Sequence, residues 1–169
     1  MDAGRKGASM FLISACLLGK NCKYDGGNNE TQWVVDFSLT HSFLPVCPEM
    51  AGGLETPRHP CEIVEKNGVV RVINDIGEDV TEAFEKGADD LIKAAQIAAM
   101  IRGQTIEGAI LKSRSPSCGG GEIYDGTFTH TLVRGDGIFV RRLRRAGITV
   151  YTENDERQVH LIGRHDFTK

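Results

Sequence analysis

The five cysteines carry the most evident chemistry in this sequence, and their spacing limits what they can do. They are Cys16, Cys22, Cys47, Cys61 and Cys118. No two of them form a C-x-x-C pair, the spacing typical of structural zinc sites. An odd number of cysteines, in a chain whose first ten residues do not look like a secretory signal, argues against a disulfide framework. Metal binding, catalysis and simple burial therefore remain open for each thiol.

Three of these cysteines follow apolar runs that are typical of buried strands. The runs are FLISAC, which ends at Cys16, SFLPVC, which ends at Cys47, and EGAILKS, which leads into the loop of Cys118. Because ligands of open α/β sheets bind beyond the carboxyl ends of the strands, we expect these three thiols to converge at one sheet edge. Cys22 and Cys61 lack this placement, and for them we favour simple burial.

Three converging thiolates leave one coordination position of a metal without a protein ligand. A catalytic zinc ion fits this pattern. An iron–sulfur cluster in which one iron has no protein ligand fits it equally well. The glycines at 52–53 and 119–121 allow close approach of the backbone to a bulky ligand, although they also suit tight turns.

Charged side chains near these cysteines are the candidates for acid–base chemistry and for substrate binding. Glu49 follows Cys47 by two residues and could act as a general acid or base, although most glutamates are solvated. Arg58, between two prolines, and Lys112 could hold a carbonyl or phosphate group of a substrate. We interpret the RRLRR segment (141–145) as a solvated helix face in preference to a nucleic-acid contact.

The strand candidates alternate with helical patterns. EIVEKNGVVRVI (62–73) predicts a β-hairpin around Asn67 and Gly68. A long helix is predicted from a capping box at Asp79 to a stop at Gly103. A second helix is predicted after Asp136 and a last strand over 148–153.

This alternation predicts an α/β fold. We expect a single-domain, Rossmann-like sandwich with a mainly parallel sheet over residues 10–169, after nine loosely ordered residues. No structure is predicted for the polar stretch after Asn154.

Composition narrows the class of protein. The chain has 169 residues, of which 40% are hydrophobic and 25% charged, as in ordinary soluble domains. A net charge of −3 gives no general attraction to nucleic acid. No apolar run approaches the roughly 20 residues of a membrane span, and we expect a cytoplasmic protein.

Several segments, taken together and in order, resemble the thiouracil desulfidase (TudS) family. They are SACLLGKNCKYDGGNN (14–29), PVCPEMAGGLETPRHPCEI (45–63), GEDVTEAFEKGA (77–88), ILKSRSPSCGGGEIYDGTF (110–128) and GITVYTEN (147–154). The resemblance covers nearly the whole chain, from about Phe11 to Asn154. It implies a desulfidase domain and a 4Fe–4S cluster with one open iron. The implied ligands are Cys16, Cys47 and Cys118.

The resemblance also implies an activity and residues that assist it. The activity is removal of sulfur from thiolated pyrimidines such as 4-thiouracil, or from 4-thiouridine in nucleotides or tRNA. Glu49 and a serine of KSRSPSC are implied as catalytic residues, with Ser113 as the first candidate. Ser115 and Ser117 follow as candidates, and with Arg58 and Lys112 they form the predicted substrate-binding set.

Two other functions compete with this interpretation. One is a non-catalytic iron–sulfur or zinc module that senses redox state or carries sulfur. The other is insertion of sulfur into tRNA, which generally needs an activated carbonyl. The sequence contains no G-x-x-x-x-G-K-[ST] loop for ATP, which counts against the second alternative.

Overall fold

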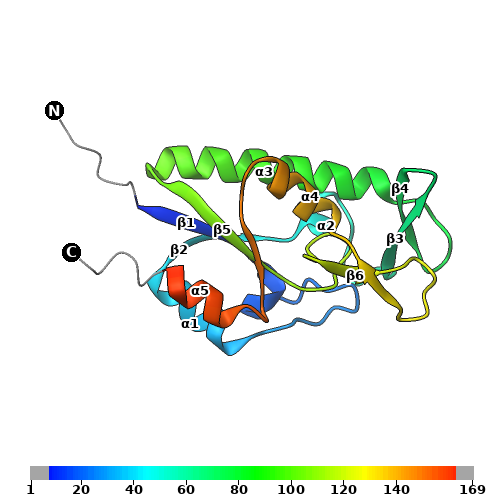
Figure 1. Ribbon diagram of the computed structural model, residues 1–169, viewed down its shortest axis with the longest axis horizontal. Helices are drawn as coiled ribbons and strands as arrows, with labels where there is room; N and C mark the ends of the chain where they lie inside the picture. Colours follow the sequence, from blue (N-terminus) through cyan, green and yellow to red (C-terminus); the bar gives the residue numbers. More distant parts are fainter. Residues whose placement is uncertain (1–7, 163–169) are drawn as a thin grey trace.

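The computed structural model describes residues 8–162 and has a parallel sheet at its centre (Figure 1). The sheet consists of β1 (Ser9–Ser14), β2 (Ser42–Val46), β5 (Thr105–Leu111) and β8 (Val150–Thr152), in the order β2-β1-β5-β8. All three pairings are parallel, which confirms the predicted fold class. Of the segment 1–9 that was predicted to be loosely ordered, only Ala8 and Ser9 are among the described residues. Residues 163–169 of the predicted domain also lie outside the described part of the chain.

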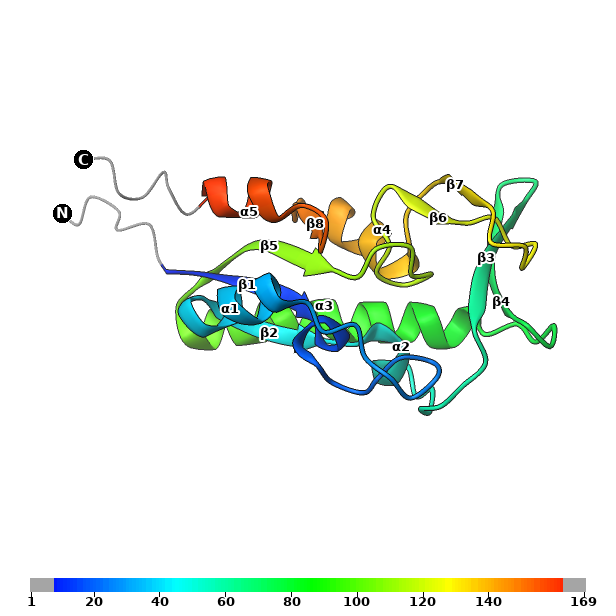
Figure 2. The same cartoon turned by 90° about the horizontal axis from the view of Figure 1, so that it is seen from below.

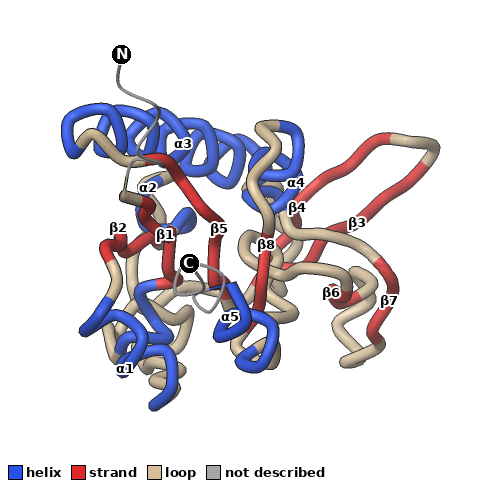
Figure 3. The backbone as a smooth tube through the Cα atoms, turned by 60° about the vertical axis from the view of Figure 1, so that its left-hand side comes forward, coloured by secondary structure: helices blue, strands red, loops and turns tan. Residues whose placement is uncertain are grey.

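Helices cover both faces of the sheet and explain why the four central residues of β1, from Met10 to Ile13, are all apolar. Met10 and Leu12 belong to one core cluster, which they share with α3 (Thr81–Arg102) and α4 (Ile138–Arg145). Phe11 and Ile13 point the other way and pack with α1 (Gln32–Thr40) and α5 (Glu156–Ile162). Figure 3 shows the resulting three layers. Helix α5 occupies the stretch for which the sequence predicted no structure.

The short helix α2 (Pro48–Ala51) lies directly on α3 because glycines face each other at the crossing. A Cβ atom at Gly87 would lie 1.9 Å from the carbonyl oxygen of Pro48. A Cβ atom at Gly52 would lie 2.0 Å from the carbonyl oxygen of Ala83. The backbones therefore touch, and this contact fixes the position of Glu49 on α2.

Two hairpins extend beyond the carboxyl ends of the parallel strands (Figure 2). The first joins β3 (Cys61–Lys66) to β4 (Val69–Asn74), and the second joins β6 (Glu122–Tyr124) to β7 (Leu132–Arg134). Asn67 and Gly68 have φ values of 53° and 75°. A two-residue hairpin turn of type I′ requires positive φ at both of its central residues. The predicted hairpin is confirmed.

The helix ends differ in part from the prediction. Gly103 ends α3 in the left-handed conformation, as expected. The predicted caps are wrong, because Val80 and Gly137 occupy the N-cap positions. Asp79 instead accepts hydrogen bonds from the amide and hydroxyl of Thr81, and Asp136 accepts one from the amide of Gly121. Among the helices of the described part of the chain, none combines the length and the apolar character that a membrane span requires.

Candidate active site

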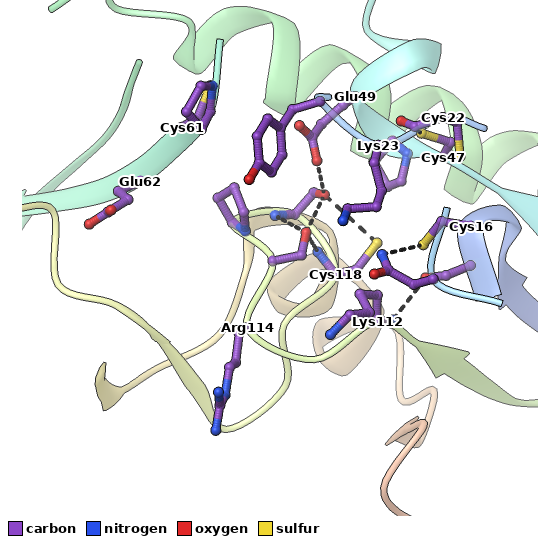
Figure 4. A pocket seen from close by; sticks show the side chains of 18 of the residues that line it. Cys16, Cys22, Lys23, Cys47, Glu49, Cys61, Glu62, Lys112, Arg114 and Cys118 are labelled. Carbon is purple, nitrogen blue, oxygen red and sulfur yellow. Dashed lines mark hydrogen bonds between the residues drawn. The ribbon is translucent and has the colours of Figure 1, made fainter. Parts of the chain in front are cut away.

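A cavity of about 600 Å³ lies beyond the carboxyl ends of β1, β2 and β5 (Figure 4). Its volume is typical of small-molecule sites, which range over about 300–1,000 Å³. All five cysteines of the chain line it, together with Glu49 and the serines at 113, 115 and 117. The cavity therefore gathers the chemistry-bearing residues of segments that are distant in sequence.

The structure brings the three predicted metal ligands to this one cavity. Cys16 belongs to the 3-10 helix η1 (Ala15–Leu18), which follows β1 directly. Cys47 follows β2 at the N-cap position of α2. Cys118 is buried in the loop after β5. The predicted convergence at the sheet edge is thus observed, whereas metal binding by these thiols stays a prediction.

Cys22 is a fourth thiol at this position, and sequence reasoning set it aside. Cys22 is 3% exposed, and its thiol affects the pKa values of both Cys16 and Cys47. The thiol of Cys47 also donates to the carbonyl oxygen of Cys22 at 4.0 Å. Figure 4 shows its sulfur beside that of Cys47. The available signal was its place in the glycine-rich loop directly after η1, the element that carries Cys16.

These contacts change the pKa values of the thiols in opposite directions. The hydrogen bond from Cys22 lowers the pKa of Cys16 to about 7 and that of Cys47 to about 6, against the effect of burial. The hydrogen bonds to Cys16 and Cys47 raise the pKa of Cys22 well above its ordinary value. Burial raises the pKa of Cys118 as well. Cys16 and Cys47 are therefore the thiols best prepared to act as thiolates, the form that binds metals.

The arrangement of these thiols bears on which metal group they fit. Within residues 8–162, no three His, Cys, Asp or Glu side chains are grouped as ligands of one metal ion. A polynuclear cluster is held by thiolates that each bind a different iron and so are further apart. The donor set, soft sulfur on separate elements around one cavity, therefore fits an iron–sulfur cluster better than a single zinc ion.

Glu49 is the centre of a first polar group, the Glu49 network, which consists of Glu49, Arg58 and Ser117. Arg58 Nε donates to Glu49 Oε1 at 3.1 Å, and Ser117 Oγ donates to Glu49 Oε2 at 3.0 Å. The side chains of Arg58 and Glu49 are only 9% and 14% exposed. Arg58 Nη2 also donates to the carbonyl oxygen of Cys22 at 2.8 Å. This network links the loop of Cys22 to α2 and to the serine before Cys118.

Ser115 organises the loop that carries Cys118. Its Oγ accepts hydrogen bonds from the amides of Ser117 and Cys118, at 3.2 and 3.0 Å. Its oxygen also lies 3.0 Å from Ser117 Oγ. Ser117 Oγ in turn lies 3.7 Å from the sulfur of Cys118. The hydroxyl of Ser115 is thus engaged within the loop, and Ser117 connects Glu49 with Cys118.

A second polar group, the Glu153 network, consists of Lys112, Ser113 and Glu153. Lys112 Nζ and Ser113 Oγ donate to Glu153 Oε1 at 2.7 and 2.6 Å, and the amide of Ser113 donates to Oε2 at 2.8 Å. Lys112 and Ser113 line the cavity, and Glu153 lies behind them. Sequence reasoning noted Glu153 only as the end of a strand, because its partners are about forty positions earlier.

Aromatic side chains form the outer part of the cavity. Tyr24 comes from the loop after η1, and Tyr124, Phe128 and His130 come from the hairpin of β6 and β7. The rings of Tyr124 and His130 meet edge to face at 5.9 Å. Flat aromatic surfaces of this kind stack well on heteroaromatic rings.

The arginines of α4 pair with neighbouring carboxylates. Arg142 Nε lies 2.9 Å from Asp89 Oδ1 on α3, and Arg144 Nε lies 3.0 Å from Asp136 Oδ2. These contacts support the interpretation of RRLRR as a solvated face that packs on its surroundings.

Comparisons with known proteins agree with the site. The model of the family described as 2-thiouracil desulfurase matches residues 11–155. The chain belongs to this family. An uncharacterized protein of Bacillus subtilis (strain 168), YbbK, is 36% identical over 152 residues, which cover 86% of this chain and 97% of YbbK.

A solved structure adds a three-dimensional likeness. The 4Fe–4S-dependent thiouracil desulfidase TudS matches with a TM-score of 0.77 and 36% identity, over 91% of this chain and 97% of that chain. The α/β fold is therefore shared with an enzyme that depends on an iron–sulfur cluster. Membership of the family supports desulfidase activity and a cluster for this chain.

Proposed function

We propose that this protein is a hydrolytic, iron–sulfur-dependent desulfidase that acts on thiolated pyrimidines. The substrates are 4-thiouracil or 4-thiouridine-type compounds, and the reaction is C=S plus water to give C=O plus hydrogen sulfide. This reaction is balanced without any oxidant or reductant. A cytoplasmic location and possible action on tRNA stay predictions from the sequence.

The observation that carries the proposal is the meeting of several thiols with a buried carboxylate–serine pair in one cavity. Cys16, Cys47 and Cys118 are the proposed ligands of the cluster, and two of them have lowered pKa values. When bound, the cluster supplies a Lewis-acidic iron with an open position for the thiocarbonyl sulfur. The soft iron also favours a sulfur leaving group over oxygen.

Glu49 is the proposed general base. Its carboxylate lines the cavity, and Arg58 and Ser117 hold its two oxygens. In this position it accepts a proton from the water that attacks the thiocarbonyl carbon. Glu49 then gives this proton to the departing sulfide, and the hydrogen bond from Ser117 orients the carboxylate for both transfers. Ser117 thus replaces Ser113 as our first candidate for the serine that assists Glu49.

The other predicted residues take supporting roles in this proposal. The guanidinium of Arg58 donates hydrogen bonds to Glu49, to the carbonyl oxygen of Cys22 and to residues 55 and 56 of its own loop. We therefore propose that Arg58 positions the base and does not bind substrate directly. Ser115 shapes the loop of Cys118 in the same way. Lys112 and Ser113 face the cavity and remain candidates for substrate contact.

The experiment that tests this function is anaerobic reconstitution with iron and sulfide, followed by metal analysis and addition of 4-thiouracil. We expect about four irons per chain, as a cubane cluster contains, and release of sulfide with loss of the thiocarbonyl absorption. Cys16→Ser, Cys47→Ser and Cys118→Ser should each lose the cluster. Cys61→Ser is the matched control and should keep it.

Two outcomes contradict the proposal. A protein that holds one zinc and no iron contradicts the cluster. A protein with an intact cluster that releases no sulfide from 4-thiouracil, 4-thiouridine monophosphate or thiolated tRNA contradicts the activity and favours a non-catalytic module.

A further inference from the structure

Glu153 is a buried carboxylate that the proposed reaction does not use. Strands β5 and β8 pair in parallel with Leu111 opposite Thr152, so Lys112 and Glu153 follow side by side. The indole nitrogen of Trp33 on α1 donates to the carbonyl oxygen of Glu153 at 2.9 Å and fixes its backbone. The side chain is 14% exposed and receives three hydrogen bonds, all of them from Lys112 and Ser113. Both partners line the cavity, so Glu153 can act on the cavity only through them.

The hydrogen bonds to Glu153 determine the direction of the Ser113 hydroxyl. A serine hydroxyl has one proton to donate and two positions at which it accepts. Burial raises the pKa of Glu153, but the hydrogen bonds from Lys112 and Ser113 outweigh burial and keep the pKa below its ordinary value. Glu153 is therefore ionised and can only accept, so Ser113 donates its proton to Oε1.

One accepting position of Ser113 remains for the cavity. Lys112 Nζ donates to Ser113 Oγ at 3.2 Å and occupies the other accepting position. Ser113 itself lines the cavity. Toward a bound molecule, Ser113 can therefore accept a hydrogen bond but has no proton left to donate.

Ser117 shows the contrasting case. Its hydroxyl lies 3.0 Å from Glu49 Oε2, 3.0 Å from Ser115 Oγ and 3.7 Å from Cys118 Sγ. Ser115 Oγ already accepts from two backbone amides, so the proton of Ser117 has two alternative acceptors, Glu49 and Cys118, and can move between them. Ser113 has a fixed direction, which suits recognition of a substrate better than transfer of a proton.

We propose that Glu153 is a positioning residue that makes Ser113 an obligatory acceptor, so that the cavity selects rings with an N–H group beside the thiocarbonyl. This inference rests on the proposed desulfidase function. In 4-thiouracil the group concerned is N3–H, adjacent to the C4 thiocarbonyl carbon. A ring whose N3 carries a lone pair meets the lone pair of Ser113 instead, which leaves both groups without a partner.

The test compares two thiones on the reconstituted protein. 1-Methyl-4-thiouracil has N3–H, whereas 1-methylpyrimidine-4(1H)-thione has a bare N3. We expect the ratio of their kcat/KM values to favour the N3–H compound, and Glu153→Gln to reduce this ratio about tenfold, the effect of one hydrogen bond. The glutamine amide can donate to Ser113, and the hydroxyl is then free to point its proton into the cavity. The two compounds also differ at C2, where only the first has a carbonyl group. Because both are measured on every variant, this difference is common to all the ratios, and a change in the ratio reports on N3.

A binding measurement gives a second readout that does not depend on turnover. The probes are the sulfur-free products, 1-methyluracil and 1-methylpyrimidin-4(1H)-one, bound to the whole chain with and without the reconstituted cluster. Wild-type protein should prefer 1-methyluracil, and Glu153→Gln and Ser113→Ala should both lose this preference. Glu156→Gln, at an exposed position of α5, is the matched control and should retain it.

The outcomes separate this inference from the proposed function. If the preference for N3–H survives in Glu153→Gln and Ser113→Ala, or is absent in wild-type protein, the inference is wrong even when sulfide is released. If the preference is present but no thione loses sulfur, the proposed function is wrong and the inferred recognition stands. Should Glu153→Gln fail to fold, Ser113→Ala decides the question alone.

Discussion

The Glu49 network and the Glu153 network are built from the same parts but face the cavity differently. Each contains one carboxylate, one cation and one serine, and in each the carboxylate side chain is 14% exposed. Glu49 lines the cavity, and each of its oxygens receives one side-chain hydrogen bond. Glu153 lies behind its partners and receives three hydrogen bonds.

This difference shows that burial alone does not identify a catalytic carboxylate. A base must present an oxygen to the reacting water, and only Glu49 has that access. Glu153 has equal burial and more hydrogen bonds, which is the pattern of a group that orients its neighbours. In the account proposed above, the Glu49 network carries out acid–base chemistry and the Glu153 network serves recognition.

The largest expected difference between the networks is in turnover. Glu49→Gln should lower kcat by about 10²- to 10⁴-fold, because it removes the general base. Glu153→Gln should lower kcat/KM for 4-thiouracil by only about tenfold, because it affects one hydrogen bond to substrate. Anaerobic assays of sulfide release at matched cluster content measure both. Equal losses, or a larger loss for Glu153→Gln, would remove the distinction between the networks.

The cations of the two networks should differ in their effect on stability. Arg58→Ala leaves Glu49 buried without its partner and should lower the free energy of unfolding by about 3–5 kcal/mol. Lys112→Ala should cost less, because Lys112 is 27% exposed against 9% for Arg58. Urea unfolding of the cluster-free protein gives both values. A cost for Lys112→Ala as large as that for Arg58→Ala contradicts this ranking.

The contact between α2 and α3 offers a way to disturb one network and spare the other. Gly87→Ala pushes its Cβ against the carbonyl oxygen of Pro48 and should cost about 1–3 kcal/mol of stability. Because α2 carries Glu49, turnover should also fall, while the preference of the cavity for 1-methyluracil persists. Gln96→Ala, an exposed position of the same helix, should change stability by less than about 0.5 kcal/mol. Loss of the binding preference in Gly87→Ala would show that the networks are not independent.

The smallest expected effect concerns the pH dependence of the thiols in the cluster-free protein. Cys16 and Cys47, with pKa values of about 7 and 6, should be alkylated by iodoacetamide at pH 7, and alkylation should decrease as pH falls through these values. Cys118 and Cys61 should react slowly at pH 7, because burial raises their pKa values.

Cys22→Ala tests the cause of these lowered values. Loss of its hydrogen bonds should raise the pKa values of Cys16 and Cys47, and at pH 5, below both values, a rise of one pKa unit slows alkylation of each thiol by about tenfold. Mass spectrometry of the alkylated peptides follows each thiol separately. Unchanged alkylation in Cys22→Ala shows that Cys22 does not activate its neighbours.

Much of the fold could be predicted from the sequence because its signals are local. The apolar run that ends at Cys16 is buried on both faces, and the Asn67–Gly68 turn has the backbone that its residues favour. The run that ends at Cys47 forms the edge strand β2 and is only partly buried. The caps failed for the opposite reason. Asp79 and Asp136 have the right residue type, but each lies one position before the N-cap. Asp79 still bonds to Thr81, the first residue of α3, whereas Asp136 bonds to Gly121.

The site could be predicted only for residues that follow predicted strands, because the carboxyl ends of parallel strands meet at one edge of the sheet. That rule placed Cys16, Cys47 and Cys118 on one cavity, but it set aside Cys22, which reaches the same place from a loop. The family resemblance ranked Ser113 above Ser117, although Ser117 is the serine bonded to Glu49. Which serine meets which carboxylate depends on packing between α2 and the loop after β5, which no local pattern reports.

The most direct test of the central claim is to follow the oxygen atom during turnover. Reconstituted protein is incubated with 4-thiouracil in water enriched in ¹⁸O, and uracil and sulfide are quantified. Hydrolytic desulfidation predicts one ¹⁸O atom at C4 of each uracil and one sulfide per uracil formed. Uracil without ¹⁸O, or no sulfide from a protein with an intact cluster, contradicts the account.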